Sequence, residues 1–184
     1  MNKRVRLVGG CFVMLLVLGG LSSWRMVEAT SKREAADGLS VGQRPPAFSV
    51  LDLRGQRQTL KQYRGQVVVL HFWATWCPYC RGEIPKLLEA FQHGPQQRVT
   101  VVTVSIDNDL ASLQAFVEQA ALPYSVIHDA STNASLAKAY DVQGIPVTYL
   151  IDRSGRVAYQ FSGASDFISA IQYLLAQDPT PSAS

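Results

Sequence analysis

The sequence predicts an α/β domain in which a central mixed β-sheet is flanked by helices. Two continuous apolar runs, at 66–73 and 98–106, are typical of strands that are covered on both faces. Strand and helix segments alternate along the chain in the order β-β-β-α-β-α-β-α-β-β-α, which is typical of an α/β sandwich. A turn signal at 153–155, between two further apolar segments, predicts a hairpin near the C-terminus.

Residues 1–29 are expected to lie outside this domain. Three positive charges in residues 1–6 precede an uncharged, mostly apolar run from Leu7 to Trp24. That run has about the minimum length for a membrane-spanning helix, and it also suits a long signal peptide with cleavage near Ala29. Because positive flanks stay in the cytoplasm, the rest of the chain is expected on the other side of the membrane. A retained anchor and a cleaved signal both remain open.

A charged, glycine-bearing linker is expected at 30–44 and the folded domain at 45–176. Apolar and polar residues alternate at 47–53, which predicts a first strand, and Thr59-Leu60 can pair back to it as an N-terminal β-hairpin. A polar, proline-containing tail is expected to fray at 177–184.

The segments that follow alternate between strands and helices. The run at 66–73 predicts a central strand, and a helix is expected to follow from Pro78. One apolar stripe of that helix is expected to face the core, with residues at i, i+3, i+4 and i+7: Ile84, Leu87, Leu88 and Phe91. The remaining segments are predicted as strands at 98–106, 125–128, 147–152 and 156–161 and as helices at 110–121, 135–140 and 167–175.

Charge and cysteine content argue against several classes of function. The net charge of +3 comes from the N-terminal segment, since basic and acidic residues balance from Thr30 onward. A nucleic-acid-binding protein would need a basic face, so no nucleic-acid partner is expected. Apart from Cys11 in the apolar run, only Cys77 and Cys80 remain, too few for a disulfide framework or a structural zinc site. We expect no metal, no cofactor and a monomer.

Cys77 and Cys80 lie where the central strand gives way to a helix. At a helix N-terminus, unpaired backbone N–H groups and the helix dipole favour negative charge on sulfur. Pro78 suits the first helical position because its missing N–H costs nothing there. The spacing brings both sulfur atoms to one face of a helical turn. The pattern predicts a redox dithiol in which Cys77, near the surface, attacks a disulfide and Cys80 resolves the mixed disulfide.

A second motif, Gly144-Ile145-Pro146, directly precedes the strand at 147–152. A proline at such a place is suited to a cis peptide bond. A cis bond would aim the Ile145 backbone at the dithiol and offer a substrate chain a main-chain edge to pair with. A trans proline that merely begins a strand accounts for the residues equally well, so the residues alone leave both forms open.

Together these motifs resemble the active site of the thioredoxin superfamily. The resemblance rests on Phe72-Trp73-Ala74-Thr75-Trp76-Cys77 with Cys80 and Pro85, and on Gly144-Ile145-Pro146. It covers nearly all of 45–176. Glu83 lies three residues after the second cysteine, and an acidic residue at that position resembles the pattern of the TlpA/ResA-like branch. Members of this branch are membrane-anchored, extracytoplasmic thiol:disulfide oxidoreductases. The resemblance implies a thioredoxin fold with an inserted helix and strand, and a cis bond at Pro146.

Two residues are candidates for proton handling beside the dithiol. On a helix the Glu83 carboxylate can lie near the Cys80 sulfur, where a half-buried acid could exchange a proton with it. The alternative is a solvated Glu83 that pairs with Lys86 or Arg81. His71 occupies the position, six residues before the first cysteine, at which thioredoxins carry a buried aspartate. It is either a base that titrates near neutral pH or a satisfied, partly buried strand residue.

Aromatic residues beside the dithiol predict a docking surface for substrates. We expect Trp76 to be exposed, Trp73 to belong to the core, and Tyr79 to influence the reduction potential and the choice of partner. The predicted substrate-binding residues are Trp76, Pro78, Tyr79, Ile145 and Pro146.

The sequence therefore predicts an envelope enzyme that reduces disulfides of envelope proteins with electrons from a membrane thiol donor. The resemblance points to cytochrome c maturation as one such process. The expected location is the outer face of the inner (cytoplasmic) membrane, or the soluble periplasm after cleavage. Three alternatives stay open: a disulfide oxidant or isomerase, a copper-handling module that uses both cysteines and His128, and a peroxidase on the related peroxiredoxin scaffold.

Overall fold

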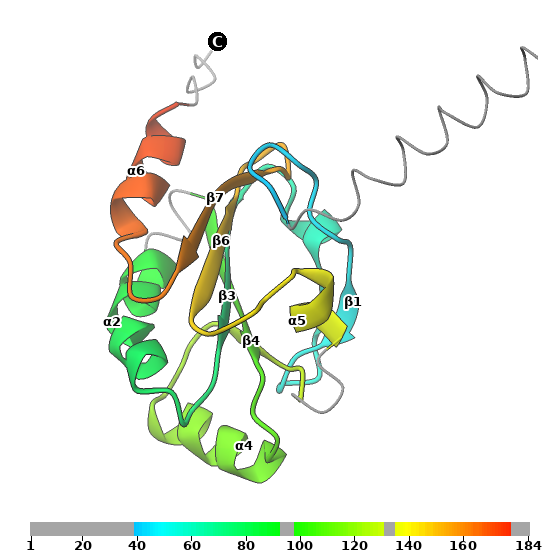
Figure 1. Ribbon diagram of the computed structural model, residues 1–184, viewed down its shortest axis with the longest axis vertical. Helices are drawn as coiled ribbons and strands as arrows, with labels where there is room; N and C mark the ends of the chain where they lie inside the picture. The colour runs from blue at the N-terminus through cyan, green and yellow to red at the C-terminus, as the bar shows by residue number, and fades with distance from the viewer. Residues whose placement is uncertain (1–38, 93–97, 131–134, 178–184) are drawn as a thin grey trace, which may run out of the picture. The chain divides into compact units, whose positions relative to one another are not determined.

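Five strands form the central sheet in the order β5-β4-β3-β6-β7. The computed structural model describes residues 39–92, 98–130 and 135–177, and Figure 1 shows their arrangement. β4 pairs in parallel with β3 and β5, whereas β6 pairs antiparallel with β3 and β7, so the sheet is mixed, as predicted. The strand bounds are β3 Val67–Trp73, β4 Val99–Ser105, β5 Ser125–His128, β6 Val147–Ile151 and β7 Val157–Ser162.

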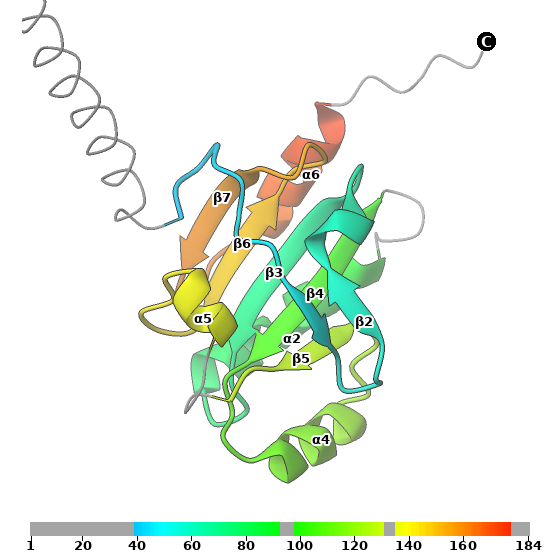
Figure 2. The same ribbon diagram turned by 90° about the vertical axis from the view of Figure 1, so that its right-hand side faces the viewer.

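The helices lie on the two faces of this sheet and make the predicted α/β layers. Figure 1 shows α2 (Pro78–Gln92) and α6 (Ile168–Ala176) on one side of the sheet and α5 (Ser135–Ala139) on the other. α4 (Leu110–Gln119) joins the core on the α2 side through Leu113. Figure 2 shows the same sheet after a quarter turn, where the strand order can be followed across the view.

The central strand β3 is buried along its whole length. Its β-branched and aromatic residues suit a pleated strand that is covered on both faces. Side chains alternate between two cores: Val67, Val69 and Trp73 pack with α2 and α6, whereas Val68, Leu70 and Phe72 pack with α5. His71 therefore points to the side of the sheet that α2 covers.

The predicted N-terminal hairpin is present as a separate two-stranded sheet. It consists of β1 (Ser49–Leu51) and β2 (Arg57–Thr59), paired antiparallel, and a short 3-10 turn, η1 (Leu60–Tyr63), follows. The turn is fixed by the buried Asp52 carboxylate, which accepts hydrogen bonds from the N–H groups of Arg54 and Gln56.

Helix α2 faces the core along most of the predicted apolar stripe. Leu87 is buried, and Ile84 and Leu88 are partly buried against the same core cluster, whereas Phe91 is 36% exposed. The buried face also contains Cys80, Glu83 and Ala90. The first half of the helix therefore presents a sulfur and a carboxylate to the sheet.

No helix within 39–92, 98–130 and 135–177 is long and apolar enough to cross a bilayer. The predicted N-terminal anchor or signal at 1–29, the first part of the linker and all but the first residue of the tail lie outside these residues. The domain boundaries at 45 and 176 stay predictions.

Candidate active site

The two cysteines lie at the end of β3 and the start of α2, joined by a disulfide. Their Cα atoms are 5.3 Å apart, within the usual range for such a bond. Cys80 is fully buried, and Cys77 is only 5% exposed, less than expected for a residue near the surface. Cys77 is nonetheless the outer of the two sulfurs, which fits a nucleophile that meets a partner's disulfide.

The start of α2 gives the Cys77 sulfur a polar environment. The Cys80 backbone N–H donates to Cys77 Sγ at 3.2 Å. Once the disulfide is reduced, this N–H and the helix dipole stabilise negative charge on the sulfur. Because the thiolate is the species that attacks a disulfide, the arrangement supports thiol–disulfide exchange.

Exposed aromatic residues flank the dithiol. Trp76 is 64% exposed and Tyr79 is 73% exposed, whereas Trp73 is buried, so the expected division between surface and core holds. Pro78, between Cys77 and Tyr79, is exposed as well. A partner that approaches Cys77 can therefore meet exposed apolar ring surface from its neighbours in sequence.

The Ile145–Pro146 peptide bond is cis, which decides the point that the residues alone left open. Ile145 packs against the core cluster that contains both cysteines. The Pro146 carbonyl accepts a hydrogen bond from Gly163 N–H at 2.8 Å. The structure thus packs the second predicted motif on the same core as the dithiol and supports its carbonyl from the segment after β7.

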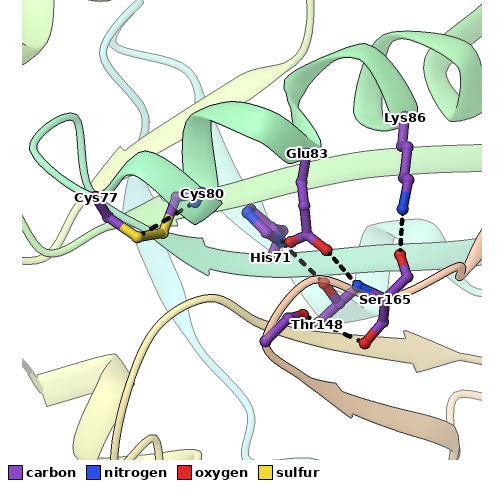
Figure 3. Close-up of polar contacts among 8 residues, drawn as sticks. His71, Cys77, Cys80, Glu83, Lys86, Thr148 and Ser165 are labelled. Atoms are coloured by element: carbon purple, nitrogen blue, oxygen red, sulfur yellow. Dashed lines mark hydrogen bonds and ion pairs between the residues drawn. A yellow bond between two sulfur atoms is a disulfide. The ribbon is translucent and has the colours of Figure 1, made fainter.

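Glu83 is buried, so the alternative of a solvated side chain is wrong. Its side chain is 1% exposed, and its Oε1 accepts a hydrogen bond from Ser165 N–H at 2.9 Å. Burial raises the pKa of Glu83, opposed in part by the Ser165 hydrogen bond and the positive charge of Lys86. Lys86 donates to the Ser165 carbonyl at 2.8 Å (Figure 3). Burial therefore favours the protonated acid, which suits a group that exchanges protons.

His71 is fully buried beneath α2. Its Nδ1 lies 2.9 Å from Thr148 Oγ1 on the neighbouring strand and 3.8 Å from Glu83 Oε2. Burial lowers the pKa of His71 to about 3, so the ring is neutral in the oxidised domain at neutral pH. His71 is therefore more deeply buried than either interpretation of the sequence predicts.

One part of the site was missed from sequence: the polar group that holds the turn before Cys77. The buried Asp107 carboxylate accepts from Thr75 N–H at 3.0 Å, from Thr75 Oγ1 at 2.7 Å and from Ser105 Oγ at 2.6 Å. A signal was available, because Asp107 follows β4, and the carboxyl ends of neighbouring parallel strands meet at one edge of a sheet.

Asp107→Asn is expected to loosen this turn. The amide offers one acceptor oxygen where the carboxylate offers two, so a buried donor loses its partner, at a cost of about 1–3 kcal/mol in unfolding free energy. The rate of insulin disulfide reduction should fall as well. Asp52→Asn is the matched control, because that buried carboxylate also accepts backbone N–H groups, but in the N-terminal hairpin. Equal rates in the two variants would show that Asp107 only supports the fold.

His128, the expected ligand of the copper-handling alternative, lies beside Asp107. Its Nε2 lies 2.7 Å from the Asp107 carbonyl oxygen. A carbonyl only accepts, so this nitrogen carries a hydrogen and is not available as a ligand in this arrangement. Within the described segments, no group of three or more histidine, cysteine, aspartate or glutamate side chains is arranged to hold a metal ion.

Comparisons with known proteins agree with this geometry. Residues 41–160 match the AhpC/TSA family. The thiol-disulfide oxidoreductase ResA of Geobacillus kaustophilus is 30% identical over 163 residues, covering 89% of this chain and 91% of the relative. The thioredoxin-like protein YneN of Bacillus subtilis is 32% identical over 146 residues, covering 78% of this chain and 82% of that protein.

The solved structures give the same result. The crystal structure of a putative thiol:disulfide interchange protein DsbE from Chlorobium tepidum superposes with a TM-score of 0.67 at 28% identity, covering 75% of this chain and 96% of that one. The fold, the disulfide at the start of α2 and the similarity over most of the chain lead to one assignment. The chain belongs to the AhpC/TSA family and is a thiol-disulfide oxidoreductase of the ResA type, with a thioredoxin-like fold.

Proposed function

We propose that this oxidoreductase reduces disulfides of envelope proteins and receives its electrons from a membrane thiol donor. The observation that carries the proposal is the position of Cys77 at the start of α2, with Trp76 and Tyr79 exposed beside it. The TlpA/ResA-like resemblance supports the direction of electron flow, and cytochrome c maturation is the process to which it points. The N-terminal segment would hold the domain at the outer face of the cytoplasmic membrane.

The reaction proceeds by two exchanges. The Cys77 thiolate attacks a substrate disulfide, so that one substrate sulfur bonds to Cys77 and the other leaves as a thiolate. Cys80 then loses its proton and attacks Cys77 Sγ, which releases the second substrate sulfur and forms the Cys77–Cys80 disulfide. The substrate gains two electrons and two protons in total, and the domain loses both. Glu83 is the proposed proton acceptor for Cys80, because it follows one helical turn later on the same buried face.

The substrate chain is proposed to lie beside Ile145 and Pro146. Main-chain atoms at that loop would pair with an extended segment next to the substrate disulfide, which recognises a backbone without requiring a particular sequence. Trp76, Pro78 and Tyr79 would cover the other side. This arrangement suits an enzyme that accepts several disulfide-bearing proteins.

A trapping experiment tests the function. The full-length Cys80→Ser variant cannot resolve the mixed disulfide, so covalent complexes through Cys77 should accumulate in cells. They should appear on non-reducing gels after thiols are blocked with an alkylating reagent, and disappear with reductant. The double variant Cys77→Ser/Cys80→Ser is the control and should give none. If the single variant also gives none, the proposed exchange with envelope proteins is wrong.

The direction of the reaction has its own measurement. Equilibration of the wild-type domain with dithiol redox buffers gives its reduction potential. A reductase should have a reduction potential toward that of thioredoxin, about −270 mV. A value near about −120 mV, typical of a strong oxidant, would support the oxidant alternative instead.

A further inference from the structure

The turn between β7 and α6 is attached to α2 by two side chains of opposite charge (Figure 3). Glu83 Oε1 accepts a hydrogen bond from the Ser165 N–H at 2.9 Å, and Lys86 Nζ donates to the Ser165 carbonyl at 2.8 Å. Glu83 and Lys86 are three residues apart on α2, where side chains are neighbours on the helix surface. One helix therefore holds both backbone groups of a single residue in the turn.

The two oxygens of the Glu83 carboxylate have different surroundings. Oε1 is bonded to Ser165, whereas Oε2 is buried, has no hydrogen-bond partner among the described residues and lies 3.8 Å from His71 Nδ1. In Figure 3 the carboxylate lies between the His71 ring and Ser165 in that view. Buried polar atoms without a partner are rare, and their presence needs a reason. Oε2 is the oxygen that is free to accept a proton, and the bond to Oε1 fixes its direction.

A carboxylate can accept the proton of Cys80 only while it is ionised. Burial of Glu83 opposes ionisation and raises its pKa, whereas the Ser165 hydrogen bond and the positive charge of Lys86 act in the opposite direction. A raised pKa makes the carboxylate a stronger base toward a thiol, provided that the backbone N–H and the ammonium group keep it ionised. The attachment of the turn thus supplies both groups that favour the charged acid.

Other charged groups described around Glu83 do not take the place of Lys86. Arg81, on the same helix, has its guanidinium over the Phe116 ring of α4, 5.6 Å from the ring centre. His71, on β3, is neutral at pH 7 because burial lowers its pKa to about 3. Neither side chain therefore supplies positive charge to the carboxylate.

The strands and the turn packed against α2 do not add a cation either. On the strands beside β3, Thr103 and Thr148 lie level with the buried histidine, and neither titrates. The Asp166 carboxylate accepts hydrogen bonds from the first turn of α6. α6 itself carries one titratable side chain, Tyr173, which is 57% exposed. Of the described groups around the acid, Lys86 is the cation that acts on it.

We propose that Lys86 is a positioning residue for the resolving exchange: through Ser165 it fixes the Glu83 carboxylate so that Oε2 accepts the proton of Cys80. The inference rests on the proposed function and adds a residue to its proton-transfer step. Lys86 acts in two ways, as a donor that holds the Ser165 backbone and as a charge that favours the ionised acid.

The step balances in protons and electrons. In the mixed disulfide, the Cys80 proton moves to Glu83 Oε2, and the Cys80 thiolate attacks Cys77 Sγ. The intramolecular disulfide forms, the bond to the substrate sulfur breaks, and the substrate thiolate leaves with the electron pair. The proton on Glu83 then passes to that thiolate, which restores the carboxylate. Lys86 keeps its own proton and its bond to Ser165 throughout.

The test separates the two exchanges with one chromogenic disulfide. Full-length protein, reduced and carrying Cys11→Ser in every variant, is mixed with one equivalent of dithiobis(nitrobenzoate) in a stopped-flow instrument. The first nitrothiolate is released when Cys77 attacks, and the second when Cys80 resolves the mixed disulfide. The rate of the second phase is measured from pH 5 to pH 10.

Lys86→Met keeps the aliphatic stem of the side chain and removes its charge and its donor. It is expected to slow the second phase about five-fold at pH 7, a part of what a general base contributes, and to leave the first phase unchanged. The rise of the second-phase rate with pH should move to higher pH, because the acid ionises less readily. Lys86→Arg should move the profile back toward wild type, since the guanidinium is charged and also donates.

Two controls separate this effect from a general loss of charge or stability. Lys138→Met removes the same charge from α5, on the opposite side of the sheet (Figure 1), and should leave both phases unchanged. The double variant Lys86→Met/Glu83→Gln should be no slower than Glu83→Gln, because a residue that acts through another adds nothing once that one is lost.

A second phase that keeps the wild-type pH profile in Lys86→Met, or losses that multiply in the double variant, would overturn the inference. If Lys86→Met does not fold, Lys86→Gln replaces it, since its amide can donate to the Ser165 carbonyl but carries no charge. An unshifted profile in that variant would also overturn the inference. Absence of the first phase in the wild type would instead count against the proposed function.

Discussion

The Cys77→Ser variant is expected to lose disulfide reduction to below about a thousandth of the wild-type rate. A serine hydroxyl is not ionised at neutral pH and cannot form a disulfide, so neither exchange can begin. Cys80 cannot replace it, because its side chain is fully buried and a substrate cannot reach it. The measurement is the steady-state rate of insulin reduction with a dithiol as electron source.

The matched variant is Cys80→Ser, which keeps the outer sulfur. It should release one equivalent of nitrothiolate from dithiobis(nitrobenzoate) at close to the wild-type rate and then stop. The pair of variants therefore assigns the two steps to the two sulfurs. Activity that survives Cys77→Ser but not Cys80→Ser would reverse the assignment.

Acid is expected to destabilise the domain through His71. In the unfolded chain this group titrates near pH 6.5, whereas burial lowers the pKa in the folded state to about 3. Between these values the unfolded state binds more protons, so its contribution to stability is complete above pH 6.5 and is lost as the pH falls toward 3. The loss from one such group is about 1.4 kcal/mol per pH unit.

Glu83 acts in the opposite direction, so a comparison of variants is needed. Its pKa is raised in the folded state, and its contribution is present below pH 4.5 and is lost as the pH rises through the folded value. Urea unfolding of wild type and His71→Asn at pH 7, 6, 5 and 4 isolates the histidine. The unfolding free energy of the variant should fall less steeply below pH 6.5. Parallel slopes would mean that the folded protein accepts a proton on His71 without cost.

Most of the fold could be predicted because the signals were local. The two continuous apolar runs form β3 and β4, and each end of these strands lies within one residue of its predicted position. Cys77 and Cys80 were placed correctly because a strand followed by a helix fixes where their backbone lies. The cis peptide bond at Pro146 was different, since the residues fit either isomer and only the family resemblance implied the observed form.

What could not be predicted depends on contacts between distant segments. The burial of Glu83 follows from the rotation of α2 about its axis, and the sheet and the segment at Ser165 set that rotation. The partner of His71 is fixed by the β3–β6 register, which pairs it with Thr148. Asp107 is an exception: it lies 32 residues from Thr75 in sequence, but its place directly after β4 could have indicated that the parallel pairing of β3 with β4 brings the two together.

The short segment at 163–165 connects the Pro146 loop with the buried Glu83 carboxylate. Gly163 N–H bonds to the Pro146 carbonyl, and Ser165 N–H bonds to the Glu83 carboxylate. Gly163 has φ +74°, a conformation that other residues adopt at a cost. A displacement of the Pro146 loop by a bound substrate chain would therefore be transmitted to the Glu83 carboxylate through three residues of main chain. Binding of a substrate chain at the proline loop, as proposed above, and the position of the Glu83 carboxylate would then be coupled through this segment.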